Sequence, residues 1–386
     1  MVNVRKDSST TADEDKFNPE VYEQGSNIGP DIALALECEN LDADLYRSSK
    51  PLWRPYSARG VFGGQVIGQA VAVSNASLQS DVYLLHSLHC YFLLAGDETR
   101  PIYYHVSRLR DGGSYVTRLV EAKQKGRCIF VLFSSYAKPE SNRPKFAIAL
   151  PRSISNDESL TPSEEVFNEA TVTITGSKII THKSRFSQER VEEGSQPKGL
   201  LSYEEAPLNE TRYEKVLKDL DNFLPQKVKD ALNAWIKDRQ ESAVEIRDAL
   251  PNMYDENGVP TQGYEQAFWM RVKSPIKGGD AGNKAALAYA SDINLLGTVP
   301  RALGISRRIK MMASLDHSMH FYEPFDFTQP ILFFMQCQVA SNGRGLVIGR
   351  FYSQSGTLLA TASQEGLVRP RDDNADIVAR AASGKL

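Results

Sequence analysis

The sequence has 386 residues, of which 41% are hydrophobic and 24% charged, with a formal net charge of -3 and a pI near 6.1. A chain of this length exceeds the size at which one hydrophobic core keeps growing, so two similar domains or a domain with a large insertion are expected. Without an overall basic field, nucleic acid is not expected as the main partner. No run of residues approaches the roughly 20 apolar positions that a membrane helix needs.

The two ends of the sequence are polar. Residues 1–28 contain no apolar segment of the kind found in signal peptides and are expected to be disordered. The chain stops at Gly384, Lys385 and Leu386, one residue away from the Ser-Lys-Leu signal that peroxisomal import receptors bind. We therefore expect the import receptor as a partner and the peroxisomal matrix as the location. A tail that ends in Lys-Leu by chance, on a cytoplasmic protein, is the alternative.

The predicted elements of the first half lie within residues 29–140. An apolar helix over 61–78 follows a pair of glycines, and it is apolar on most faces, which indicates that it is buried. Runs of β-branched and aromatic residues then predict strands at 83–94, 101–109, 114–123 and 127–137. This order predicts a sheet wrapped round a helix.

Residues 141–240 read as a polar insertion that is partly helical. Apolar residues recur at helical spacing over 213–220 and again over 228–236, and Pro225 separates the two patterns.

The second half, 241–371, repeats the pattern of the first. Strands are predicted at 244–247 and 266–272, an apolar helix at 284–296, and further strands at 311–321, 330–340, 343–354 and 357–369, before a tail over 372–386. The predicted helix includes Asp292 among apolar residues, and a carboxylate in such surroundings needs a reason.

Two stretches of the first half recur in the second. Residues 96–104 resemble 325–333, and the turn at 124–127 resembles that at 354–357. A duplication is the economical explanation, and it predicts an α+β fold made of two similar units.

Six short motifs carry a family resemblance. The first half contains GVFGGQVIGQA at 60–70, HSLHCYF at 86–92 and LRDGGSY at 109–115, and the second contains LAYASD at 287–292, SLDHSM at 314–319 and ASQEG at 362–366. In these motifs the chain resembles the type II acyl-CoA thioesterases. The resemblance implies a double hotdog fold of two tandem hotdog domains, and hydrolysis of acyl-CoA by a water that Asp292, Ser314 and Gln364 activate together.

The chemistry suits these three residue types. A thioester carbonyl is electrophilic, so a positioned water and a general base suffice, and Asp292 is the candidate base. Ser314 and Gln364 offer donors and acceptors that can orient one water. Projected by the repeat offsets, the three residues fall on Gly63, Leu85 and Ser134. Since these cannot form the same group, the N-terminal half is expected to be catalytically silent.

Two further groups are candidates for binding the substrate. The backbone N–H groups of Gly63 and Gly64, at the start of the first helix, are candidates for an oxyanion hole. A basic cluster just before Ser314 is a candidate site for the CoA phosphates, with an ordinary solvated turn as the alternative: Arg301, Arg307, Arg308 and Lys310.

Other functions remain open at this point. A hotdog enoyl-CoA hydratase or dehydratase, and a non-catalytic acyl-CoA binding module, are the alternatives. The histidines are spaced three apart in 86–89 and in 317–320, and such residues face opposite sides of a strand, so no metal is expected. No cofactor is expected either. The fold permits a monomer, and we expect a homo-oligomer.

Overall fold

The computed structural model describes residues 31–371, apart from 50, 57, 141–143, 149–199, 221, 223, 251–252, 255–260 and 307. The predicted disordered segment 1–28, much of the insertion, and the tail with Gly384, Lys385 and Leu386 lie outside the described residues. Among the residues that are described, no helix combines the length and apolar composition that crossing a lipid bilayer requires.

The first half is an antiparallel sheet that wraps round helix α2, Gly63–Ala76. The predicted helix and all four predicted strands are confirmed within a few residues: β3 Leu84–Phe92, β4 Tyr103–Asp111, β5 Tyr115–Gln124 and β6 Arg127–Ala137. Three short elements before α2 were not predicted: α1 Ile32–Leu36, β1 Cys38–Asp42 and β2 Leu45–Ser48. The two strands are short, and β1 is mostly exposed, so their apolar alternation is too weak to identify them.

The second half has the same arrangement round helix α5, Gly279–Ser291. Its strands are β7 Val244–Asp248, β8 Glu265–Val272, β9 Ile309–Ser314, β10 Asp316–Phe321, β11 Ile331–Ser341, β12 Arg344–Ser353 and β13 Leu358–Pro370. A short helix, α6 Thr298–Ala302, lengthens the connection between α5 and β9. It was not predicted.

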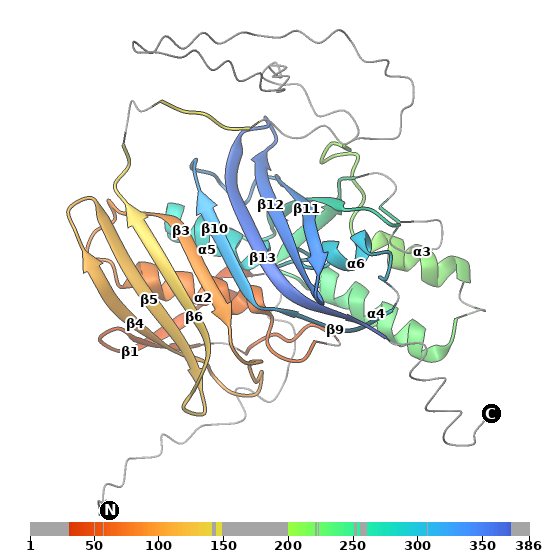
Figure 1. Ribbon diagram of the computed structural model, residues 1–386, viewed down its shortest axis with the longest axis horizontal. Helices are drawn as coiled ribbons and strands as arrows, with labels where there is room; N and C mark the ends of the chain where they lie inside the picture. Colours follow the sequence, from red (N-terminus) through yellow and green to blue (C-terminus); the bar gives the residue numbers. More distant parts are fainter. Residues whose placement is uncertain are drawn as a thin grey trace, which may run out of the picture.

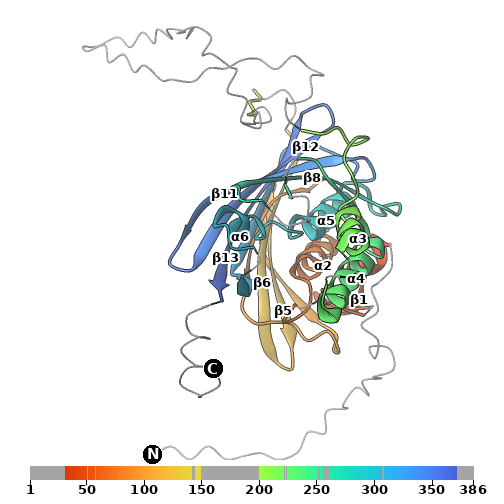
Figure 2. The same ribbon diagram turned by 90° about the vertical axis from the view of Figure 1, so that its right-hand side faces the viewer.

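Strand β3 pairs with β10, and this pairing joins the two halves into one continuous sheet of 13 strands within the described residues. Helices α2 and α5 pack against each other on one side of that sheet (Figures 1 and 2). Both helices are buried along most of their length. The α+β double hotdog prediction is therefore confirmed. We keep 29–140 and 241–371 as the proposed limits of the two halves.

The described part of the insertion includes two amphipathic helices. Helices α3, Thr211–Leu220, and α4, Gln226–Gln240, match the two predicted helical patterns, and Pro225 directly precedes α4. They lie on the same side of the sheet as α2 and α5 but farther from the strands (Figure 2). The rings of Tyr213 and Trp235 hold them together, with 5.5 Å between ring centroids. The insertion thus adds a layer over the central helices.

The helix predicted over 284–296 has to be corrected, because α5 ends at Ser291 and Asp292 is its C-cap. Apolar residues continue beyond the helix end, and Ile293, Leu295 and Leu296 are buried in the core from a turn in which Asn294 has a φ of 59°. The apolar pattern persisted because the turn packs into the same core as the helix. Asp292 therefore lies at the helix end, where the chain changes direction.

The strand predicted over 311–321 is also corrected, because β9 and β10 are separated at Leu315. Ser314 is opposite Gly366, whereas Ser318 is opposite Ser363, so one strand advances four residues while β13 advances three. Such an extra residue is a β-bulge, and bulges are frequent beside active sites, where they redirect side chains.

Candidate functional site

Asp292, Ser314 and Gln364 come together although they belong to three different elements. The Gln364 side-chain amide Nε2 donates to Asp292 Oδ1 at 2.6 Å and to Ser314 Oγ at 3.0 Å. Asp292 caps α5, Ser314 ends β9, and Gln364 lies in the middle of β13 with its side chain fully buried. The amide nitrogen must face the carboxylate, because an ionised carboxylate can only accept hydrogen bonds.

Two hydrogen-bonding capacities in this group remain unused. Ser314 Oγ accepts from Gln364, so its own hydrogen is available to donate elsewhere. Within the described part of the chain, Gln364 Oε1 is buried without a hydrogen-bond partner. Buried polar atoms are normally satisfied, so such an atom, in a residue bonded to Asp292 and Ser314, indicates a place for a water or a substrate group.

Burial raises the pKa of Asp292 from 3.8 to about 6, and hydrogen bonds from Gln364 and from the Gly64 backbone N–H oppose that rise. The carboxylate is consequently ionised at neutral pH, yet it is more basic than an exposed aspartate. A general base works best when its pKa lies near the operating pH. The environment of Asp292 therefore suits proton abstraction.

Gly63 and Gly64 lie against Asp292 at the N-terminus of α2. A Cβ atom on Gly63 would come within 2.7 Å of Asp292 Oδ2, and one on Gly64 within 2.2 Å of the Tyr289 carbonyl oxygen, so both positions require glycine. The Gly64 N–H is directed at the Asp292 carboxylate. The N-terminal half thus contributes a backbone donor to the group of residues in the other half.

A pocket of about 760 Å³ opens beside Asp292 and Ser314. Its walls come from both halves and from α4, and they include Trp53, Phe62, Phe92, Met312 and Trp235. The sequence did not reveal that the insertion helices contribute to the site, since residues of α4 approach it only through the tertiary fold. The apolar lining and the nearby polar group fit a ligand with an apolar tail and a reactive polar centre.

Of the basic residues expected at the CoA phosphates, the structure describes Arg301, Arg308 and Lys310. Arg301 is buried, and its guanidinium donates to the backbone oxygen and the hydroxyl of Thr261, so it does not join an exposed cluster. Arg308 and Lys310 are exposed at the start of β9. Arg307 lies outside the described residues.

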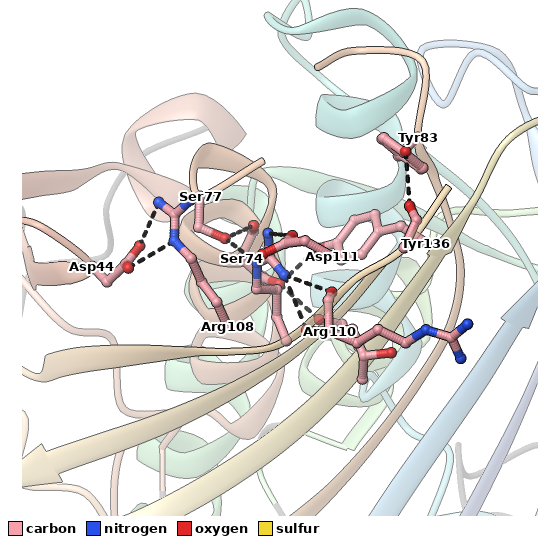
Figure 3. A network of polar contacts seen from close by, with 12 residues as sticks. Asp44, Ser74, Ser77, Tyr83, Arg108, Arg110, Asp111 and Tyr136 are labelled. Atoms are coloured by element: carbon pink, nitrogen blue, oxygen red, sulfur yellow. Dashed lines mark hydrogen bonds and ion pairs between the residues drawn. The ribbon is translucent and has the colours of Figure 1, made fainter. Parts of the chain in front are cut away.

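In the first half, the C-terminal end of α2, which corresponds to the Asp292 end of α5, is occupied by a buried arginine. Arg118 on β5 donates to Ser77 Oγ and to the carboxylate of Asp111, and its side chain is fully buried. Ser74 accepts from Tyr136 and bonds to Ser134 in the same network (Figure 3). Arg118 and its hydrogen-bond partners therefore fill the space at the C-terminal end of α2.

The structure corrects the counterpart of Asp292 in the first half. Ser77 caps the end of α2 as Asp292 caps α5, whereas Gly63 begins α2. The repeat offset failed because α6 lengthens the second connection. For the strands the offset holds, since Ser134 faces Arg118 across β5 and β6 as Gln364 faces Val347 across β12 and β13.

No group of three or more potential metal ligands occurs among the described residues.

Comparisons with known proteins point to one family. Residues 50–137 match the model of the acyl-CoA thioesterase N-terminal domain, and residues 222–368 that of the C-terminal domain. Acyl-coenzyme A thioesterase 8 of Rattus norvegicus is 31% identical over 88% of this chain and 89% of its own length. Peroxisomal acyl-coenzyme A thioester hydrolase 1 of Saccharomyces cerevisiae is 25% identical over 81% of this chain and 87% of its own. The crystal structure of the acyl-CoA thioesterase II TesB2 from Mycobacterium marinum, 25% identical, superposes with a TM-score of 0.57, covering 89% of this chain and 98% of that one.

Proposed function

Since this chain belongs to the acyl-CoA thioesterase family, we propose that it hydrolyses fatty-acyl-CoA to a free fatty acid and CoA with Asp292, Ser314 and Gln364 activating the water. The observation that carries the assignment of residues is the Gln364 amide, which bonds to both Asp292 and Ser314 beside the pocket. The amide group of Gln364 thus links two side chains from distant parts of the chain.

The proposed reaction needs only the substrate and water. Asp292 takes a proton from a water held by Ser314 and Gln364, and the water oxygen forms a bond to the thioester carbonyl carbon. The tetrahedral intermediate then collapses, the carbon–sulfur bond breaks with its electron pair going to sulfur, and a proton reaches the thiolate. The products are a carboxylic acid and the CoA thiol, and no residue is acylated.

The Gly63 N–H remains our candidate oxyanion donor. It lies at the N-terminus of α2, where unpaired backbone N–H groups and the helix dipole favour negative charge. The neighbouring Gly64 N–H is already directed at Asp292, so it supports the base.

Thiol release from long-chain acyl-CoA, followed with a thiol reagent, tests the proposed function. Steady turnover with one equivalent of fatty acid formed per thiol is the expected result. Binding without thiol release on any acyl length would favour a binding module. Consumption of an enoyl-CoA double bond without thiol release would favour a hydratase.

Lys310 is proposed to contact a phosphate of CoA. Lys310, Met312 and Ser314 share one face of β9 because side chains on a strand alternate, and Met312 and Ser314 line the pocket. Lys310 therefore lies at the rim, about 13 Å along the strand from Ser314 at roughly 3.3 Å per residue. Arg308 is the next proposed contact, and Arg301 is the weakest because it is engaged with Thr261.

Lys310→Ala is expected to raise KM for acyl-CoA by about 3- to 10-fold at low salt and leave kcat nearly unchanged, because an exposed ion pair is worth roughly 1 kcal/mol and is screened by salt. Initial rates at low and high ionic strength check this. The control is Lys125→Ala, at the turn between β5 and β6, where the side chain pairs with Asp97. Equal KM values for the two variants would contradict the proposal.

We also propose that the protein works in the peroxisome and that the import receptor binds its last three residues. The Saccharomyces cerevisiae relative carries a peroxisomal name, which supports this location. Deletion of 384–386 from a fusion with an N-terminal fluorescent protein should change a punctate peroxisomal signal to a diffuse one. Gly384→Ser should keep the punctate signal. A punctate signal that survives the deletion would contradict the proposal.

A further inference from the structure

At the bulge after Ser314, the side chain of Asp316 holds Glu365, the residue next to Gln364. Leu315 N donates to the Glu365 carbonyl oxygen at 2.9 Å, and Glu365 N donates to Asp316 Oδ1 at 3.0 Å. At the bulge, the Asp316 carboxylate thus replaces the backbone carbonyl that would otherwise accept from Glu365. Because Glu365 directly follows Gln364, this contact holds β13 in place at the catalytic amide.

His317, which follows Asp316, contacts the residue that precedes Asp292. His317 Nε2 lies 2.9 Å from Ser291 Oγ, and Ser291 Oγ donates to the Ala288 carbonyl oxygen at 2.8 Å. Since the serine hydrogen is used for Ala288, the histidine must donate from Nε2 and Ser291 accepts. Ser291 is the last residue of α5 and directly precedes Asp292.

The bulge explains how Ser314 and His317 can both face inward. Residues three apart on a regular strand point to opposite faces, and the extra residue restores a common face. The first half has the same irregularity, with a register shift between Leu85 and Ser87 on β3. The β-bulge is therefore common to both halves, but the side chains at the bulge differ between them.

Two of the differing positions are those that make the contacts described above. Since Ser134 corresponds to Gln364, Phe133 corresponds to Ser363. Ser318 is opposite Ser363 as His89 is opposite Phe133, so by this register Asp316 corresponds to Ser87 and His317 to Leu88. Leu88 is fully buried, so an apolar side chain satisfies packing at this place in the fold. Of the two halves, the one with Asp292 has the polar pair.

The histidine is kept at a cost in stability. His317 is 1% exposed, and within the described residues its Nδ1 atom has no hydrogen-bond partner, which is unfavourable for a buried polar atom. Burial lowers the pKa of His317 to about 3, so the ring stays neutral at physiological pH and is unsuited to proton transfer. Polar groups retained against local stability commonly serve a function.

We propose that Asp316 and His317 are positioning residues, which hold Gln364 and Asp292 in place through Glu365 N–H and Ser291. This rests on the proposed function. Neither side chain touches the reacting atoms, so their effect is on the alignment of the three residues that do.

Two substitutions exchange these residues for those of the first half, His317→Leu and Asp316→Ser. Each is expected to lower kcat by on the order of 10- to 100-fold, the loss typical of a misplacement near 1 Å, with KM changed less than about threefold. His317→Gln, which retains a donor, and Asp316→Asn, which retains the acceptor, should recover most of the activity. Met319→Leu, a core change two residues along β10, is the control and should keep kcat.

The pH profile separates positioning from general destabilisation. Donors from Gln364 and Gly64 lower the pKa of Asp292, so loosening them should move the acidic inflection of kcat/KM upward from about 6 in His317→Leu. Folded variants with unchanged kcat and inflection would overturn the proposal. Losses that the conservative variants fail to restore, or that Met319→Leu shares, would overturn it as well.

Nitrogen NMR of the labelled histidine rings provides a readout without turnover. We expect His317 to remain a neutral Nε2–H tautomer down to about pH 4, and its signal to change in Ser291→Ala. A ring that titrates near 6.5 in an active enzyme overturns the inference while the proposed function stands. The expected tautomer in a protein without thiol release shows that the proposed function has failed and the contact is real.

Discussion

Asp292→Asn should lower kcat for thiol release by at least about 100-fold, the lower range for loss of a general base, and should leave the fold intact. The asparagine retains the shape of the side chain and can still bond to Gln364, but it cannot take a proton from water. Thiol release under saturating acyl-CoA measures the effect. The control is Asp219→Asn, which changes an exposed carboxylate on α3 and should behave as wild type. A variant with wild-type turnover would remove Asp292 as the base.

The same substitution should raise stability at neutral pH. The folded protein binds the Asp292 proton more tightly than the unfolded chain, since the pKa is about 6 in the fold and 3.8 without it. Between these values the folded state holds more protons, so the free energy of unfolding falls as pH rises, and the full penalty is present above about pH 6. Removing the charge should stabilise by roughly 1–3 kcal/mol. Thermal unfolding at pH 7.5 should show the gain, and it should vanish near pH 4.

Arg118→Ala should lower the free energy of unfolding by about 3–5 kcal/mol, a large fraction of what a natural protein has. The substitution leaves a cavity in the first half, and it deprives Ser77 and Asp111 of their donor. Urea unfolding followed by circular dichroism measures the loss.

The matched control for Arg118 is Arg108→Ala on the adjacent strand. Arg108 forms a pair with Asp44 near the surface (Figure 3), with side chains 36% and 25% exposed, so its loss should be at most about 1 kcal/mol. Turnover of folded Arg118→Ala at low temperature should match wild type. A folded variant that has lost turnover would show that the Arg118 end of this half takes part in catalysis.

Much of the fold follows from patterns within short stretches of the sequence. Strands such as β6 and β12 contain runs of β-branched and aromatic residues, and α2 is apolar on most faces, so local composition and spacing identify them. The three proposed catalytic residues were found through motifs rather than geometry. Asp292 alone had a local signal, since it is a carboxylate among apolar neighbours.

The remaining features depend on contacts between distant residues. The bulge at Leu315 is defined by its register against β13, and an apolar alternation cannot report it within a few residues. The end of α5 was obscured because Ile293 and Leu295 pack into the core from a turn. The place of Trp235 in the pocket wall, and the burial of Arg301, follow only from how α4 and α6 pack.

Arg118, which plugs the space at the C-terminal end of α2 in the first half, bears on how such a protein could arise. Two identical subunits related by a two-fold axis must have the same side chain at both helix ends, so a pair of that kind would have either two bases or two plugs. Fusion of the two copies into one chain removes that constraint. Ser77 with Arg118 could then evolve for rigidity, and Asp292 with Val347 for reactivity. The asymmetry of this molecule is therefore a property that two identical subunits cannot have.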